Sequence, residues 1–260
     1  MRLRRVSLKS MDPDDIHDLR VASRRFRAIL ELLYPFAPKG QKTYLRKKVR
    51  KLTQVLGGLR NIDEAELFFQ SRASGKFSIG STLCHTLAKL RASEFVRIKK
   101  ALKEFDQGKM DAMVQEIVAE LADASLRKRN GTSLLAYLSE VSIRQYLPIH
   151  RLLSSAAIPE RRTSRHSLRI AIKKWRYFFE IITQILGCDY TRTLELLKEY
   201  QSILGQMNDI AEFELLLAPL KLPREERAKS RALLKAEDAR LLACLEELIE
   251  HKPLAYTFLL

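Results

Sequence analysis

One sixteen-residue segment of the chain divides its side chains between two opposed faces of a helix. The segment is IHDLRVASRRFRAILE, residues 16–31. At about 100° per residue, one arc of roughly 80° holds the polar residues, and the opposite side holds the apolar ones. The polar residues are His17, Arg20, Arg24, Arg27 and Glu31, and the apolar ones are Leu19, Ala22, Phe26, Ile29, Leu30 and Leu33. We therefore expect an amphipathic helix that buries Phe26 and Leu30 and displays cations over about 15 Å, long enough to contact several linked anionic groups.

The same pattern returns 149 residues later in RHSLRIAIKKWRYFFE, residues 165–180. Its polar face carries His166, Arg169, Lys173, Arg176 and Glu180, and its apolar face carries Leu168, Ala171 and Trp175. Further along, LGGLRNIDEAE (residues 56–66) matches LGQMNDIAEFE (residues 204–214) at an offset of 148. We interpret the two matches as an internal duplication that has lost one residue in the turn between the matching helices.

Composition favours an almost wholly helical fold. Apolar residues make up 46% of the 260 residues, enough for a substantial core in one or two domains. Glycine and proline are scarce, apolar residues recur at helical spacing, and no segment alternates convincingly between apolar and polar residues. The expected class is therefore all-α.

The charge balance points to an anionic partner. Lys and Arg number 47 against 31 Asp and Glu, which leaves a net charge of +16. Such a surplus repels itself unless nucleic acid, a phosphate polymer, anionic lipid or counterions gather around it. Cys84, Cys188 and Cys244 lack C-x-x-C spacing, so we expect reduced thiols and neither a disulfide framework nor a structural zinc site.

Targeting signals are weak. The segment MRLRRVSLKSMDPDD begins with basic residues but has no apolar stretch of the kind found in signal peptides. No run approaches 18 uninterrupted apolar residues, so we expect no membrane insertion and a cytoplasmic protein. No cofactor is expected.

Caps and turns divide the chain into three parts. In a first repeat, about 12–106, Asp12-Pro13 should begin a helix that ends near Tyr34-Pro35, and Gly57 should stop a second helix. Asn61 with Glu64 resembles a capping box, which Asp209 and Glu212 repeat in the second copy. The helices expected after the opening one are about 42–56, 61–71 and 82–105 in the first repeat, 109–128 and 133–156 in a connecting part (about 107–158), and 163–186, 190–204, 209–218 and 224–250 in the second repeat (about 159–252). RASGKFSIGS (residues 72–81) and Arg129-Asn130-Gly131-Thr132 read as loops.

These helices predict a single domain over residues 1–260. It would contain two four-helix bundles related by a pseudo-twofold axis, with an extra helical pair between them. The two basic faces would then line a shared groove.

The repeated H-x-x-R-x-x-x-[RK]-[RK]-x-R helix, with the LG-x-x-[RN]-[ND] motif that follows it, resembles the CHAD family, the conserved histidine α-helical domains. The resemblance covers nearly the whole chain. It implies a helical double bundle whose basic cavity binds inorganic polyphosphate, with members found on polyphosphate granules. The family's binding motif corresponds to His17, Arg20, Arg24, Arg25 and Arg27, and again to His166, Arg169, Lys173, Lys174 and Arg176. We add Lys47, Arg50, Lys51 and Lys198 on the next helix of each repeat to the candidate polyphosphate-binding residues.

The chain departs from its own first repeat and from the family at a few positions. Glu195 and Glu199 make the second copy less basic than Lys47 and Lys51, so binding would be asymmetric. Asn61 stands where the family usually has Asp, which would affect only the turn. No E-x-E-x-K motif of a triphosphate-tunnel domain is present, so triphosphatase activity has no basis here.

Other functions receive less support from the residues. A phosphohydrolase needs a nucleophile, a metal or paired carboxylates beside the cations, whereas Glu31 and Glu180 read as ion-pair partners of arginines. Metal binding is disfavoured because Glu31 lies about 21 Å along the helix from His17 and no H-E-x-x-H motif occurs. The two basic helix faces are therefore expected to be neither catalytic nor metal-binding.

Nucleic acid is the main rival ligand. A basic groove binds any dense polyanion, but Phe26 and Trp175, which could stack on bases, fall on the apolar face. No helix-turn-helix element with base-contacting residues is evident. The expected function is non-catalytic polyphosphate binding, and a general polyanion-binding or nucleic-acid-binding protein, or a scaffold for an acidic protein, stays open; protein partners are unknown.

Overall fold

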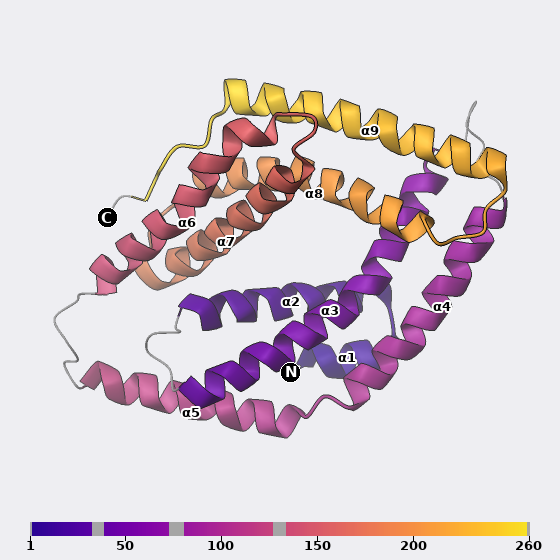
Figure 1. The fold of residues 1–260 in the computed structure, drawn as a ribbon. Coiled ribbons are helices and arrows are strands. Elements are labelled where there is room, and N and C mark those ends of the chain that lie inside the picture. Colours follow the sequence, from indigo (N-terminus) through magenta and orange to yellow (C-terminus); the bar gives the residue numbers. More distant parts are fainter. Residues whose placement is uncertain (1, 33–38, 73–80, 127–133, 259–260) are drawn as a thin grey trace. The chain divides into compact units, whose positions relative to one another are not determined.

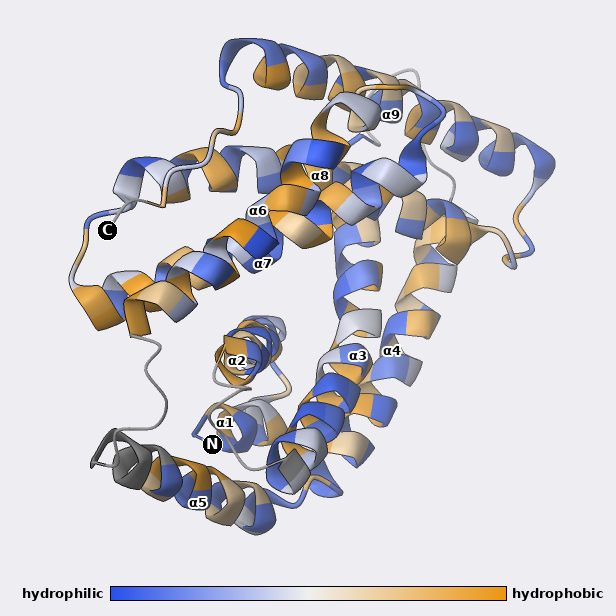
Figure 2. Ribbon diagram, turned by 60° about the vertical axis from the view of Figure 1, so that its left-hand side comes forward, coloured by the Kyte–Doolittle hydropathy of each residue, from blue (hydrophilic) through white to orange (hydrophobic). Residues whose placement is uncertain are grey.

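The computed structural model describes residues 2–32, 39–72, 81–126 and 134–258. Within these ranges all regular secondary structure is α-helical, in nine helices (Figure 1), which confirms the expected all-α class. Hydrophilic and hydrophobic residues alternate along the labelled helices, as amphipathic helices require (Figure 2). The chain separates into two compact units, Met1–Gly131 and Thr132–Leu260.

The first unit is built around its longest helix. Its helices are α1 (Arg2–Ser10), α2 (Pro13–Leu32), α3 (Lys39–Gln70), α4 (Ser81–Lys103) and α5 (Gln107–Leu126). Helices α2 and α4 both pack on α3, α1 contacts α2 and α4, and α5 contacts α3. The polar face of α2 is therefore positioned by α3.

Two apolar clusters hold α2 against α3. In one, Ile16 and Leu19 of α2 pack with Leu52, Leu56 and Leu59 of α3 and with α4. In the other, Leu30 packs with Leu45 and Val49 of α3 and with α5, and Phe26 is only partly buried against this cluster. Burial of Leu45, Val49, Leu52 and Leu56 agrees with the sequence pattern. Ile29, expected on the apolar face, is exposed.

The second unit has an aromatic core. Its helices are α6 (Leu134–Ala156), α7 (Arg162–Leu186), α8 (Thr191–Leu217) and α9 (Arg224–His251), and each packs on the next in the chain. Trp175 and Phe179 of α7 are fully buried, with ring centroids 5.0 Å apart. The ring of Phe179 lies 4.8 Å from that of Tyr190. The residues after α9 return to this core through Phe258.

Several predicted boundaries are confirmed. Helix α2 begins at Pro13, and the Asp12 carboxylate accepts a hydrogen bond from the Asp14 amide at 2.8 Å, as an N-cap does. Helix α7 ends at Leu186, and the following Gly187 has a φ of 67°, the left-handed conformation that glycine favours just after a helix. Pro219 and Pro223 lie between α8 and α9.

The predicted breaks at Gly57 and before Asp209 are wrong, because α3 and α8 each continue through them. Glycine inside a helix costs about 1 kcal/mol relative to alanine, which made a stop plausible. However, Leu56 and Leu59 flank the glycine pair and are buried in the core, and Leu204 and Met207 flank Gly205 in the same way. Tertiary packing on both sides of each glycine outweighs its low helix propensity, so Asn61–Glu64 and Asp209–Glu212 are not capping boxes.

Helix α1 was not predicted, because the N-terminal residues were considered only as a targeting signal. Leu3 and Leu8 pack on the cluster that holds α2, and Arg4 Nε donates to the Leu102 carbonyl at 2.8 Å. The end of the first helix near Tyr34-Pro35, the turn at 129–132 and all but the two ends of the predicted loop 72–81 lie outside the described residues. Ser81, the last residue of that predicted loop, already begins α4. None of the described helices is long and apolar enough to cross a membrane.

Candidate anion-binding site

The polar face of α2 carries the predicted cations in two kinds of setting. His17 and Arg25 are exposed, whereas Arg20, Arg24 and Arg27 are partly buried. The Nε atoms of these three arginines are enclosed by protein, so the solvent-accessible surface of each side chain belongs to its other atoms. Packed stems of this kind restrict where the guanidinium groups point.

Arg20 extends from α2 across α3. Its Nη1 donates to the carbonyl of Thr53 at 3.3 Å. The same nitrogen lies 2.9 Å from the position that a Cβ atom at Gly57 would occupy. Gly57 thus leaves room for the Arg20 guanidinium on the surface of α3.

A buried polar contact lies beneath Arg20. The hydroxyls of Ser23 and Thr53 are 2.9 Å apart, and Ser23 Oγ also donates to the Arg20 carbonyl at 2.8 Å. Sequence reasoning gave Ser23 no role, because the second copy has Ile172 there. The signal that it missed was that α2 and α3, which pack together, each carry a small hydroxyl residue, Ser23 and Thr53.

The α3 cations do not all face the same way. Lys47, Arg50 and Lys51 are exposed. Helical geometry places Arg50 about 60° from Thr53, toward the side that meets α2. Lys51 instead lines a cavity of about 140 Å³ together with Ala101 of α4 and Phe105. The structure therefore brings Arg50 to the side that meets α2, while Lys51 faces α4.

The polar face of α7 repeats this division of exposure. His166 and Lys174 are exposed, while Arg169, Lys173 and Arg176 are partly buried. The Nε atoms of Arg169 and Arg176 are enclosed, like those of Arg20 and Arg27 at the matching positions. Lys198, which matches Arg50, is exposed on α8.

Two α7 side chains have neighbours in the second unit that hold them in place. His166 Nδ1 lies 2.9 Å from Asn208 Oδ1 of α8, so a protonated Nδ1 would leave Nε2 available to a ligand. Arg176 forms an ion pair with Glu180 at 3.3 Å, which fits the expected ion-pair role of this glutamate. Its guanidinium also lies 5.5 Å from the centre of the Tyr177 ring.

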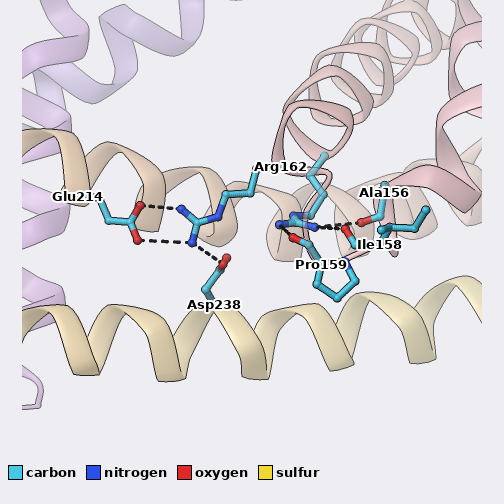
Figure 3. Close-up of polar contacts among 7 residues, drawn as sticks. Ala156, Ile158, Pro159, Arg162, Glu214 and Asp238 are labelled. Carbon is cyan, nitrogen blue, oxygen red and sulfur yellow. Dashed lines mark hydrogen bonds and ion pairs between the residues drawn. The ribbon is translucent and has the colours of Figure 1, made fainter.

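Two further arginines fix the start of α7 (Figure 3). Arg165 is buried and donates to the carbonyls of Ile158 at 2.8 Å and Pro159 at 2.9 Å. Burial lowers the pKa of the Arg165 guanidinium. Arg162 lies between Glu214 of α8 and Asp238 of α9, at 2.6 and 2.7 Å, and the bond to Glu214 is the main cause of its raised pKa. These contacts anchor the helix from which His166 and Arg169 project, and sequence reasoning assigned neither arginine a role.

The described residues contain no group of three or more His, Cys, Asp or Glu side chains that could hold a metal ion. The three cysteines are free thiols. The chemistry that the two faces offer is cationic: arginine forks for bidentate hydrogen bonds, lysine ammonium groups as point charges, and an imidazole at one end.

Comparison with known proteins places the chain in a family. The model of the CHAD domain matches residues 3–218. The chain belongs to the CHAD family. Among solved structures, the CHAD domain from the plant Ricinus communis superposes with a TM-score of 0.73 at 21% identity, covering 98% of this chain and 87% of that one.

A second solved structure has the same fold. PptA from Streptomyces chartreusis matches with a TM-score of 0.67 at 12% identity, and the match covers 95% of this chain and 92% of that one. At these identities the two likenesses show a common fold. A comparison with curated proteins found no match.

Proposed function

We propose that this CHAD protein binds inorganic polyphosphate without chemically changing it, and that the polar faces of α2 and α7 line one groove around the polymer. The observation that carries the proposal is the matched arrangement of the two faces. Each has an exposed histidine followed by arginines whose stems are enclosed at equivalent positions, Arg20 with Arg27 and Arg169 with Arg176. Membership of the CHAD family supports the proposal, because the resemblance to this family implies polyphosphate binding.

Polyphosphate suits these faces because it presents closely spaced oxyanions along a flexible chain. An arginine fork makes two charge-assisted hydrogen bonds to phosphate oxygens, and a row of such forks along about 15 Å of helix follows successive phosphates. Enclosed stems reduce the conformational entropy that binding would otherwise remove. Recognition would therefore depend on charge density and on the path of the chain.

Nucleic acid fits these faces less well. Single-stranded nucleic acid binds through aromatic side chains on which bases stack, but Trp175 is fully buried and Phe26 packs against the apolar cluster. A general polyanion-binding protein would still attract both polymers by counterion release. A comparison of the affinities for polyphosphate and for nucleic acid of equal charge therefore distinguishes a polyphosphate-binding protein from a general polyanion-binding protein.

The test is titration calorimetry of the whole chain at about 150 mM salt, where weak surface attraction is screened. The ligands are long-chain polyphosphate and single-stranded and duplex DNA of matched phosphate count. We expect polyphosphate to bind more tightly and to displace DNA at much lower concentration than the reverse. Equal or tighter binding of DNA would instead make this a general polyanion-binding or nucleic-acid-binding protein.

Charge reversal then locates the site. Arg20→Glu/Arg169→Glu should abolish the preference for polyphosphate over DNA. Lys99→Glu/Lys100→Glu is the matched control, because it changes the net charge by the same amount on the exposed surface of α4. Circular dichroism of both variants checks that each remains folded. Equal losses in the two variants would mean diffuse attraction and would reject the groove. Association with polyphosphate granules is part of the same proposal, and a fluorescent fusion of the Arg20→Glu/Arg169→Glu variant should lose it.

A further inference from the structure

A second site is suggested by a cavity of about 440 Å³ in the second unit. It lies between the C-terminal end of α8, the connection to α9 and the first turns of α9. Arg162 at the start of α7 and Glu214 of α8 also line it. This volume is in the range of ordinary small-molecule sites.

The walls of the cavity are apolar. Leu217, Leu222 and Leu234 are each at least nine-tenths buried and contribute side chains from α8, the connection and α9. Such a surface takes up the apolar part of a ligand, because its burial removes apolar area from water. A bare inorganic anion would leave these leucines uncovered.

The rim of the cavity is cationic. Arg227, Arg231 and Lys235 follow one another at four-residue spacing and so share one face of α9. Arg227 keeps its place by donating from Nη2 to the Leu220 carbonyl at 2.7 Å. Arg231 and Lys235 are exposed and have no carboxylate partner in the described part of the chain.

The one carboxylate that lines the cavity does not cancel this charge. Glu214 is held by Arg162 Nη1 at 2.6 Å, and Asp238 binds the other terminal nitrogen (Figure 3). The three charges on α9 therefore remain in excess at the cavity. An anionic group at the rim would be attracted to them.

A buried hydroxyl lies under the cavity. Ser230 is 1% exposed, and its Oγ is enclosed and has no hydrogen-bond partner within the described residues. A hydroxyl in this position costs free energy unless something accepts its hydrogen bond. Because Ser230 lines the cavity, its hydroxyl is a candidate hydrogen-bond donor to a ligand group there.

We propose that this cavity binds a small organic anion, in which one carboxylate, sulfonate or phosphate group is attached to an apolar body. The anionic group contacts Arg231 and Lys235, and the apolar body lies against Leu217, Leu222 and Leu234. This site is independent of polyphosphate binding, because it uses none of the cations assigned to the α2 and α7 faces.

The probe for the test is 8-anilinonaphthalene-1-sulfonate, which combines a sulfonate with an apolar ring system and fluoresces when shielded from water. We expect saturable binding to the whole chain at about 150 mM salt. Arg231→Gln/Lys235→Gln should weaken it roughly tenfold, since charge-assisted contacts are lost. The matched control Arg224→Gln/Arg240→Gln removes two exposed charges from the same helix outside the cavity and should leave the affinity unchanged.

Occlusion tests the shape of the site without changing charge. Ala218→Phe places a ring at the cavity from an exposed position and should abolish saturable binding, whereas Ala239→Phe, at an exposed position of α9 outside the cavity, should not. Failure of the unmodified chain to bind the probe, or equal binding by Ala218→Phe, would overturn the proposal. Long-chain polyphosphate should bind Ala218→Phe as it binds the unmodified chain, so failure of this site and failure of the polyphosphate proposal give different results.

Discussion

The Arg20 guanidinium lies over Gly57, with Nη1 only 2.9 Å from where a Cβ atom of residue 57 would stand. At the matching position of α8, a Cβ atom on Gly205 would meet nothing within 4 Å. The two glycines therefore occupy equivalent places in the sequence but have different neighbours. Gly57 makes room for the Arg20 guanidinium, and Gly205 faces open space.

Gly57→Ala should displace Arg20 and weaken polyphosphate binding roughly three- to tenfold, the effect of impairing one charge-assisted contact. The change adds a methyl group and leaves every charge in place. Calorimetry with long-chain polyphosphate measures the loss. An unchanged dissociation constant would show that polyphosphate binding does not depend on the space that Gly57 leaves for Arg20.

Gly205→Ala is the control for that experiment. It makes the same chemical change inside α8 without a clash, so binding should be unaffected. Because alanine has the higher helix propensity, the free energy of unfolding should rise by up to about 1 kcal/mol. A thermal melt checks this rise, and a drop in stability would contradict the open environment of Gly205.

Polyphosphate affinity should fall steeply with salt. For nucleic acids, the slope of log K against log salt is about −0.7 to −0.9 for each phosphate neutralised. By analogy, Arg27→Gln/Arg176→Gln should make the slope shallower by roughly 1 to 2. The surface pair Lys99→Gln/Lys100→Gln should leave the slope within error, and an identical change in both variants would argue against discrete contacts.

Stability should fall at high pH because of Tyr200. Burial raises the pKa of Tyr200 to about 12, and its hydroxyl donates to the carbonyls of Leu248 and Lys252 at 3.2 and 2.9 Å. Below pH 10 the phenol is protonated in both the folded and unfolded chains. Between pH 10 and 12 the unfolded chain loses the proton first, which removes about 2–3 kcal/mol of stability.

The variant Tyr200→Phe isolates this contribution. It loses the two hydrogen bonds at every pH, but it should lose less additional stability than the unmodified chain between pH 10 and 12. Urea unfolding at pH 8, 10 and 11.5 measures the difference. Parallel pH profiles for the two proteins would assign the alkaline loss to other groups.

Arg165→Met should destabilise the second unit by about 2–4 kcal/mol, because the carbonyls of Ala156, Ile158 and Pro159 lose their donor while the side chain keeps its bulk. Chemical denaturation followed by circular dichroism measures the change. Arg161→Gln, at the exposed neighbouring residue on the N-terminal side of α7, should alter stability by less than about 0.5 kcal/mol.

Periodicity predicted most of the helices and most of the residues they bury, because burial in an all-helical fold depends on local spacing. Leu45, Val49 and Trp175 are buried as that spacing requires. The turns expected at Gly57 and Asn61 are absent, because contacts of distant residues on both sides of α3 stabilise a continuous helix. Local propensity carries no information about such contacts.

The candidate site was predicted less completely than the fold. Matching sequences made His17, Arg20 and their counterparts candidates, since charge spacing on a helix is visible in the sequence, and their role in binding stays a prediction. The hydroxyl contact of Ser23 with Thr53 and the anchoring of α7 by Arg165 depend on partners in other segments, so spacing within one helix could not reveal them. The different surroundings of Gly57 and Gly205 are likewise a property of packing.

Trp175 is the single tryptophan of the chain, and it is fully buried among the aromatic residues of the second unit. Its emission is therefore an intrinsic spectroscopic label for unfolding of residues 132–260, while the far-ultraviolet helical signal records both units. Comparing the two transitions measures how cooperatively the halves unfold. No dye or added probe is needed, since the chain already contains a reporter confined to one half.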